Sequence, residues 1–206
     1  MTIIDDRLNL IEGITLQHGM HADFKAGMCL LEATAWIAGE EWSDHPSCVC
    51  PVLAAFGRSW NDSLNEADRN RILKPFVARL VGTRSTPEVQ DARAFMAADW
   101  AVRTFTVAWL RKAGLDADAD ALAALPELSS VELCKAAMPT IAKARASASA
   151  AGDAAGDAAW AAARAAARDA ARDAAGDAAG DALASTVTEL QDSASDLFAR
   201  MIAVTS

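Results

Sequence analysis

The fold of this chain is decided by residues 152–183, GDAAGDAAWAAARAAARDAARDAAGDAAGDAL, where four-residue units made mostly of alanine follow one another. Alanine is the strongest helix former, because it loses no side-chain rotamer entropy on folding. The tract therefore predicts a helix. Its side chains are too small to build a core or to enclose a substrate, so we expect a surface that packs against another helix.

The repeat period of four exceeds the 3.6 residues of an α-helical turn, so each unit advances about 40° around the helix axis. Alanine and glycine faces consequently turn to several sides, and such faces let helix axes approach at the low end of the roughly 8–10 Å range. The expected partner is a helix of this chain or of a second copy; a solvated helix is the alternative. The candidate contact residues are Trp160, Arg164, Arg168, Asp169, Arg172 and Asp173.

Residues 185–206 are predicted to form an amphipathic helix, because Leu190, Leu197 and Met201 recur at helical spacing. This apolar face packs on the aromatic core of the same chain, or it meets its copy in an oligomer. The sequence thus divides into an aromatic-rich helical core domain (1–145), an alanine-rich tetrad-repeat helix (146–184) and an amphipathic C-terminal helix (185–206).

No segment shows the sustained alternation of β-branched residues that is typical of strands, so the predicted fold class is all-α. We expect a helical bundle with a long alanine-rich C-terminal helix or helical hairpin. Gly39 is expected to end one helix, Pro75 should bend or interrupt a second, and Pro139 should perturb a third. The expected helices of the core domain include residues 24–38, 51–64, 66–81 and 87–114.

The helix at 87–114 carries the widest apolar stripe of the chain, in which Phe95, Val102, Phe105 and Trp109 recur at helical spacing. A stripe of this width predicts a position at the centre of the fold rather than on its surface. Asp99 and Arg103 are four residues apart on the same helix, which is the spacing of a structural ion pair.

One region could carry chemistry, because all three histidines and three of the four cysteines lie between residues 18 and 50. His-x2-His and His-x2-Cys-x-Cys spacings can each present two ligands to a tetrahedral zinc ion. The alternatives are a Cys–His nucleophilic pair, or buried cysteines that act as small hydrophobes. Glu32, flanked by apolar residues, is a candidate partly buried carboxylate. The candidate metal ligands are His18, His21, His45, Cys48 and Cys50.

The charge balance points away from nucleic acid, because the net charge is −9 and lysine and arginine form no basic stripe. The first residues, MTIIDDRLNL, lack the pattern of a signal peptide, and the alanine tract is too often interrupted by charge to span a bilayer. Four irregularly spaced cysteines are typical of reduced thiols. We therefore expect a cytoplasmic protein with no membrane partner.

Residues 27–62, GMCLLEATAWIAGEEWSDHPSCVCPVLAAFGRSWND, resemble a segment of uncharacterised proteins of actinobacteria and their phages. The likeness continues through LKPFVARLVGT (73–83) and the tryptophan-containing helix to the tail of GDAA, WAAA and RDAA units. This family offers no activity and no site residues to carry over. What the resemblance implies is an all-helical protein in a phage or bacterial setting.

Together these patterns predict a non-catalytic protein that works by binding or assembly, with a protein partner or a second copy of itself and with no cofactor. In a phage or bacterial setting this favours a partner-blocking role of the inhibitor or immunity type. The alternative is an enzyme or sensor that depends on zinc or on a Cys/His pair, built on His18, His21 and residues 45–50.

Overall fold

Helices make up all the regular structure of the part of the chain that the computed structural model describes, residues 3–165 and 170–205, with side chains for 3–153 and 183–205. The predicted all-α class and the long C-terminal helix are confirmed. None of the described helices is both long and apolar enough to cross a membrane. The chain divides into two compact units, Met1–Ala94 with Ser195–Ser206, and Phe95–Ala194.

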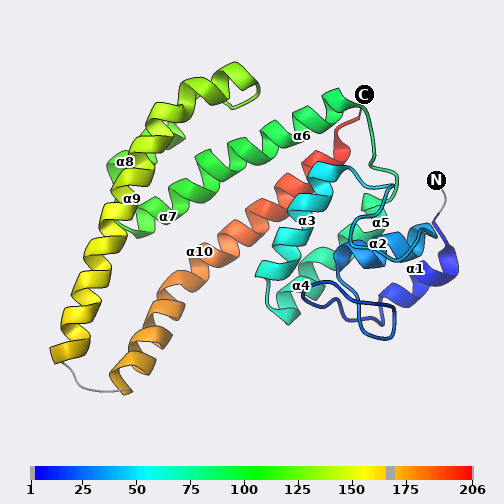
Figure 1. Ribbon diagram of the computed structural model, residues 1–206, viewed down its shortest axis with the longest axis horizontal. Helices are drawn as coiled ribbons and strands as arrows, with labels where there is room; N and C mark the ends of the chain where they lie inside the picture. Colours follow the sequence, from blue (N-terminus) through cyan, green and yellow to red (C-terminus); the bar gives the residue numbers. More distant parts are fainter. Residues whose placement is uncertain (1–2, 166–169, 206) are drawn as a thin grey trace. The chain divides into compact units, whose positions relative to one another are not determined.

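The first unit is built from short helices, which Figure 1 labels in chain order. Gly39 has a φ of 72° and ends a helix, as predicted, and the helix beginning at Glu66 is interrupted at Pro75. The elements are α1 (Asp5–Ile11), α2 (Leu30–Ala38), α3 (Pro51–Ser63), α4 (Glu66–Leu73), the 3-10 turn η1 (Lys74–Phe76), α5 (Val77–Leu80), the start of α6 (Pro87–Trp100) and the last turns of α10 (Ala170–Ala203).

The core of this unit is an aromatic cluster around Phe198, which is fully buried. Its ring centroid lies 5.5 Å from that of Phe56, 5.9 Å from that of Trp60 and 5.0 Å from that of Phe76. Aromatic pairs at these distances stabilise a core beyond their buried area alone. Leu197 and Met201, two candidate contact residues, are also buried within the chain. The end of α10 therefore packs on the aromatic core, which was the first of the two predicted arrangements.

A buried arginine fastens the end of α10 to the start of α6. Arg93 is only 2% exposed, and its guanidinium donates to the carbonyls of Met201 (2.8 Å), Val204 (2.9 Å) and Thr83 (2.7 Å). Met201 lies in the last turn of α10 and Val204 directly follows the helix, where the helix dipole favours a positive charge. Figure 1 shows the two segments side by side at this point. Arg93 thus donates to one carbonyl of the last turn of α10 and to one directly after it.

The second unit is organised around the long helix that begins at Pro87. After α6 it continues as a π-helix, η2 (Ala101–Thr106), and ends as α7 (Val107–Lys112). The remaining elements are α8 (Asp116–Ala123), α9 (Val131–Ala165) and α10 as far as Ala194. Its buried apolar cluster consists of Val107, Leu110, Ala119, Leu122 and Ala144.

The predicted apolar stripe on this helix is not buried as expected. Phe105 is 40% exposed, and Trp100 and Trp109 are half-buried. The π-helix is the physical reason, because its wider turn shifts the register and the α-helical spacing no longer keeps one face inward. The rings of Trp100 and Phe105, five residues apart, lie 5.5 Å from each other. The predicted Asp99–Arg103 ion pair is confirmed at 3.0 Å.

The alanine tract is helical in its described parts, as predicted, with α9 reaching Ala165 and α10 beginning at Ala170. Pro139 lies inside α9, which continues past it. Leu190 is buried. The side chains of Trp160, Arg164, Arg172 and Asp173, and the whole of Arg168 and Asp169, lie outside the described residues. The contacts predicted for the tract therefore stay a prediction.

Candidate functional site: the pinned loop

The candidate site is the segment of residues 12–29, which joins α1 to α2 without regular structure. We call it the pinned loop. It overlaps the helix predicted at 24–38, which in fact begins only at Leu30. Gly27 has a φ of 125°, a value that an α-helix cannot contain, and this explains the late start. Loops of this length inside a small domain are uncommon and are often functional.

Side chains of α3 and α4 hold the first half of the pinned loop in place. Asn70 accepts from the backbone N–H of Leu16 (2.8 Å) and donates to its carbonyl (3.2 Å). Asn61, which is 1% exposed, donates to the carbonyl of Gln17 (3.0 Å), and Asp62 accepts from the N–H of Gly19 (2.9 Å). Backbone groups that a helix would satisfy internally are thus satisfied by other elements.

The second half of the loop is fixed by Glu32, a fully buried residue of α2. Its Oε1 accepts from the backbone N–H of His21 (2.6 Å), and its Oε2 lies 2.8 Å from Nδ1 of His21 and 2.8 Å from the N–H of Cys29. Nε1 of Trp42 donates to the carbonyl of His21 (2.9 Å). The backbone and the ring of His21 are therefore both fixed by side chains from other elements.

The contact with Glu32 also favours one tautomer of the histidine. With Glu32 as a carboxylate, which can only accept, this contact is a hydrogen bond when Nδ1 of His21 bears hydrogen. In the neutral ring the lone pair is then on Nε2. The His21 side chain is only 10% exposed, so most of the ring is covered by the unit.

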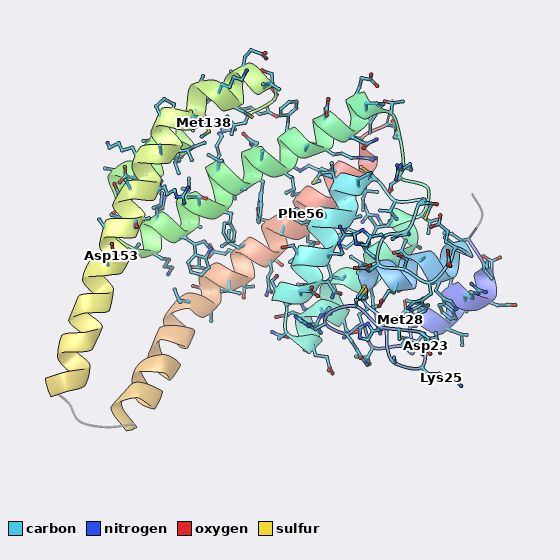
Figure 2. The ribbon with its side chains drawn as sticks, viewed as in Figure 1. Asp23, Lys25, Met28, Phe56, Met138 and Asp153 are labelled. Carbon is cyan, nitrogen blue, oxygen red and sulfur yellow. The ribbon has the colours of Figure 1, made fainter. Side chains whose placement is uncertain are left out.

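The tip of the pinned loop displays two large apolar side chains. Asp23 accepts from the N–H groups of Lys25 (2.8 Å) and Ala26 (3.0 Å), which closes a tight turn. Phe24 sits on this turn with its ring 4.8 Å from that of Trp36, yet it is 46% exposed, and Met20 is 76% exposed. Figure 2 shows Asp23 and Lys25 at the outer edge of the unit. The loop is therefore a fixed support for an apolar tip.

Gly27 is the position at which a side chain would disturb the loop most. A Cβ atom there would lie 2.4 Å from Oε1 of Gln17 and 2.8 Å from Cδ2 of His21. We expect Gly27→Ala to lower the free energy of unfolding by about 1–3 kcal/mol, because it adds this clash to an unfavourable φ. Gly19→Ala is the matched control: its φ of 82° is also positive, but its Cβ would meet nothing within 4 Å. If urea unfolding showed the same loss of stability for Gly27→Ala and Gly19→Ala, the clash at Gly27 would not be the cause.

Two thiols of this unit are poorly suited to act as nucleophiles. Burial raises the pKa of the Cys29 thiol from 9.0 to about 12, and the nearby Glu32 carboxylate adds to the shift. Burial and then the charge of Glu40 raise the pKa of Cys48. A nucleophilic cysteine needs its thiolate form, which these surroundings disfavour. A Cys–His nucleophilic pair on Cys48 is therefore not supported.

The raised pKa of Cys29 predicts a loss of stability in alkali. Between pH 9 and 12 the unfolded thiol has released its proton, while the folded thiol keeps it. The contribution of the protonated Cys29 thiol to stability is thus complete below pH 9 and is lost as the pH rises toward 12. Above pH 9 we expect the free energy of unfolding, measured with urea, to fall more steeply with pH for the wild type than for Cys29→Ala. The difference in slope should correspond to at most one proton released on unfolding. Parallel pH profiles would contradict this.

The predicted metal ligands are not gathered around one point. His18 and His45 are exposed, and Cys48 and Cys50 are buried. Among the described residues, no three His, Cys, Asp or Glu side chains form a group that could hold a metal ion. The structure instead joins His21 to Glu32. Zinc on the full predicted set stays a prediction that metal analysis must test.

The sequence drew attention to His21 and Glu32 separately, but it did not indicate that they meet. It also missed Asn61, Asn70 and Trp42, the residues that hold the pinned loop. Met20 and Phe24, its exposed apolar residues, were equally unnoticed. A run of polar and glycine residues between positions 12 and 27 was the signal for a loop, and the expected helix at 24–38 obscured it.

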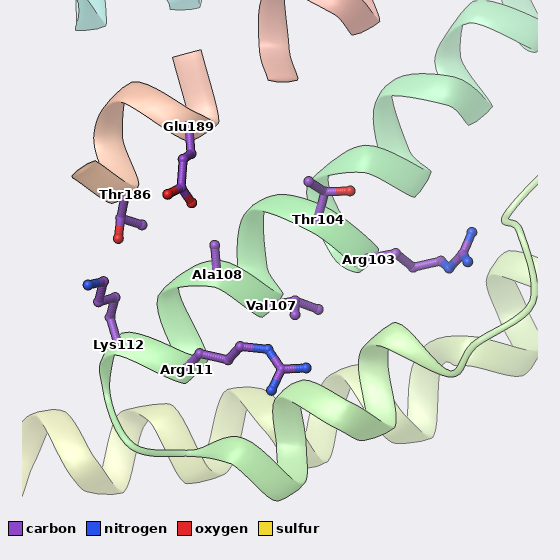
Figure 3. A pocket seen from close by; sticks show the side chains of 8 residues that line it. All are labelled: Arg103, Thr104, Val107, Ala108, Arg111, Lys112, Thr186 and Glu189. Atoms are coloured by element: carbon purple, nitrogen blue, oxygen red, sulfur yellow. The ribbon is translucent and has the colours of Figure 1, made fainter. Parts of the chain in front are cut away.

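A second surface feature is an open hollow in the unit Phe95–Ala194, with a volume of about 510 Å³ (Figure 3). Its basic residues do not converge: Arg103 pairs with Asp99 at 3.0 Å, and Arg111 pairs with Asp120 at 2.8 Å. Figure 3 shows both guanidinium groups turned away from α10. The hollow is lined by Arg103, Thr104, Val107, Ala108, Arg111, Lys112, Thr186 and Glu189.

Comparison with known proteins adds no relative to this picture: no family model, no curated protein and no solved structure matches the chain.

Proposed function

We propose that this chain is a non-catalytic binding protein that contacts a protein partner through the tip of the pinned loop. The proposal rests on one observation: two apolar side chains are exposed at the tip, while the loop that bears them is held in one conformation. Met20 and Phe24 are 76% and 46% exposed, while the loop beneath them is held by the side chains of Glu32, Asn61 and Asn70. Methionine and aromatic residues are enriched in protein interfaces.

The fixed conformation of the loop matters because surfaces that become ordered on binding lose conformational entropy, and this loss opposes association. A loop that is already held in one conformation lowers this cost, so a small apolar contact can give useful affinity. A partner-blocking role of the inhibitor or immunity type is consistent with such a surface, because blocking needs only affinity and shape. A phage or bacterial origin belongs to the same proposal.

The test compares three chains in parallel: the wild type, Met20→Ser/Phe24→Ser, and Leu10→Ser. Leu10 is the matched control, because it is 57% exposed and lies on α1, outside the loop. Each chain is immobilised and exposed to extract of the source cells, and every retained protein is purified and measured again in isolation. We expect the double substitution to weaken one defined complex by at least about 30-fold, and the control to leave it unchanged.

Self-association is the other form of the same proposal, and native mass spectrometry of the purified chain reports it directly. An oligomer that dissociates in the Met20→Ser/Phe24→Ser chain would identify a second copy as the partner. If every complex and the subunit count were the same in all three chains, the pinned loop would not be the contact surface.

A further inference from the structure

We infer that Met20 is a reversible oxidation site, at which hydrogen peroxide converts the tip of the pinned loop from apolar to polar. The effect of this modification on a bound partner rests on the proposed function, but the modification itself does not. The inference follows from how far the Met20 side chain is exposed, how its neighbours in the loop are held, and where the other methionines of the chain lie.

The reaction transfers one oxygen atom from the peroxide to the thioether sulfur of Met20. The O–O bond breaks and an S–O bond forms, so the sulfur is oxidised by two electrons and the peroxide is reduced. The proton of the transferred oxygen passes to the departing oxygen, which leaves as water. The product is methionine sulfoxide, a polar side chain in place of a flexible apolar one, and methionine sulfoxide reductases reverse the change.

Met20 is accessible to a dissolved oxidant, because 76% of the residue is exposed. Met28 and Met201 are 1% and 0% exposed, and a buried thioether reacts only when the core around it opens. Peroxide should therefore oxidise Met20 well before either of them. Met138, which is 57% exposed on α9 in the other unit (Figure 2), is the other exposed methionine among the described residues.

The two neighbours of Met20 in the chain are held by side chains from other helices. The N–H of Gly19 donates to Asp62 of α3 (2.9 Å), and the N–H of His21 donates to Glu32 of α2 (2.6 Å). These hydrogen bonds use backbone groups on either side of Met20 and not its thioether. Oxidation should therefore change the chemistry of the tip and leave the conformation of the loop intact.

The modification acts on the surface through which we propose that the chain binds its partner. The sulfoxide adds a strong hydrogen-bond acceptor to the tip that also displays Phe24. An acceptor that is buried in an interface without a donor weakens binding. The oxidised chain should consequently bind the partner about 10–100-fold more weakly than the reduced chain. Peroxide would thus release the contact, and reductase would restore it.

The experiment treats the full chain with hydrogen peroxide and follows the gain of one oxygen atom at each methionine by peptide mass mapping. The starting chain is Met138→Leu, which lacks the other exposed thioether, and Met20→Leu/Met138→Leu is the matched control. We expect Met20 to be oxidised at least about 10-fold faster than Met28 or Met201. Oxidation should shorten retention on a hydrophobic-interaction column, reductase should restore it, and the control should not respond. Urea unfolding should be unchanged.

Two results without any partner would overturn the inference: oxidation of Met28 or Met201 as fast as that of Met20, or a change in retention that is equally large in the control. The oxidised and reduced chains are then compared in the binding assay of the proposed function. A complex that both bind equally well would show that Met20 does not control the contact. If the untreated chain retained no partner, the proposed function would fail, while the oxidation rates and the retention would still decide this inference.

Discussion

Arg93→Ala is expected to lower the free energy of unfolding by about 3–5 kcal/mol, the largest effect that we predict for a single substitution. The guanidinium is 2% exposed and donates to the carbonyls of Met201, Val204 and Thr83. Removing it takes a donor from three carbonyls, those of Met201 and Thr83 in buried contacts and that of Val204 in a part-buried one, and opens a cavity. Urea unfolding followed by circular dichroism measures the loss.

Two further variants separate hydrogen bonding from the mere loss of an arginine. Arg93→Lys keeps a positive charge near the end of α10 but cannot reach three carbonyls at once, so it should recover only part of the stability. Arg84→Ala removes an exposed arginine from the same unit and should change stability by no more than about 0.5 kcal/mol. If Arg93→Ala cost no more than Arg84→Ala, the three hydrogen bonds would not stabilise the fold.

Glu32→Ala is expected to lower the free energy of unfolding by about 2–4 kcal/mol and to release the pinned loop. The fully buried carboxylate accepts three hydrogen bonds, two from His21 and one from Cys29. Hydrogen bonds to charged groups are worth about 1.5–3 kcal/mol each, and removing the acceptor leaves buried donors unpaired. Hydrogen exchange should show the change, because the amides of His21 and Cys29 lose their protection.

The controls for this prediction use the same residue type. Glu12→Ala removes an exposed carboxylate from the loop itself and should leave both stability and exchange unchanged. Glu32→Gln keeps the volume and one acceptor, so we expect a smaller loss than for alanine. Protection of His21 and Cys29 that survived in Glu32→Ala would show that the loop is held chiefly by Asn61 and Asn70.

Local signals in the sequence predicted a large part of the fold. Alanine content predicted that residues 152–183 are helical, Gly39 predicted a helix end, and Pro75 predicted a bend or an interruption, because each of these effects acts within one or two turns. The prediction of a buried aromatic stripe was wrong, because a π-helix cannot be recognised from helical spacing. The π-helix places Phe105 at the surface.

The candidate site was less predictable, because it depends on contacts between residues that are distant in sequence. Asn70 binds Leu16 across 54 positions, and no local pattern indicates such a pair. Ligand spacing suggested that His21 belongs with the other histidines and cysteines, whereas the fold places it on Glu32. Spacing can propose which residues share a short segment, but the buried partner of a side chain is decided by tertiary packing.

The composition of the first unit has a consequence for the order of events during synthesis. Its core is shared between the first 94 residues and the segment Ser195–Ser206, and the bonds of Arg93 to Met201 and Val204 join positions 108 and 111 residues apart. Domains usually fold as they leave the ribosome, N-terminal part first. Here the rings of Phe56, Trp60 and Phe76 can pack against Phe198 only after the whole alanine tract has been translated. The nascent chain therefore carries an unfinished aromatic surface through most of its translation, when chaperones would have their greatest influence.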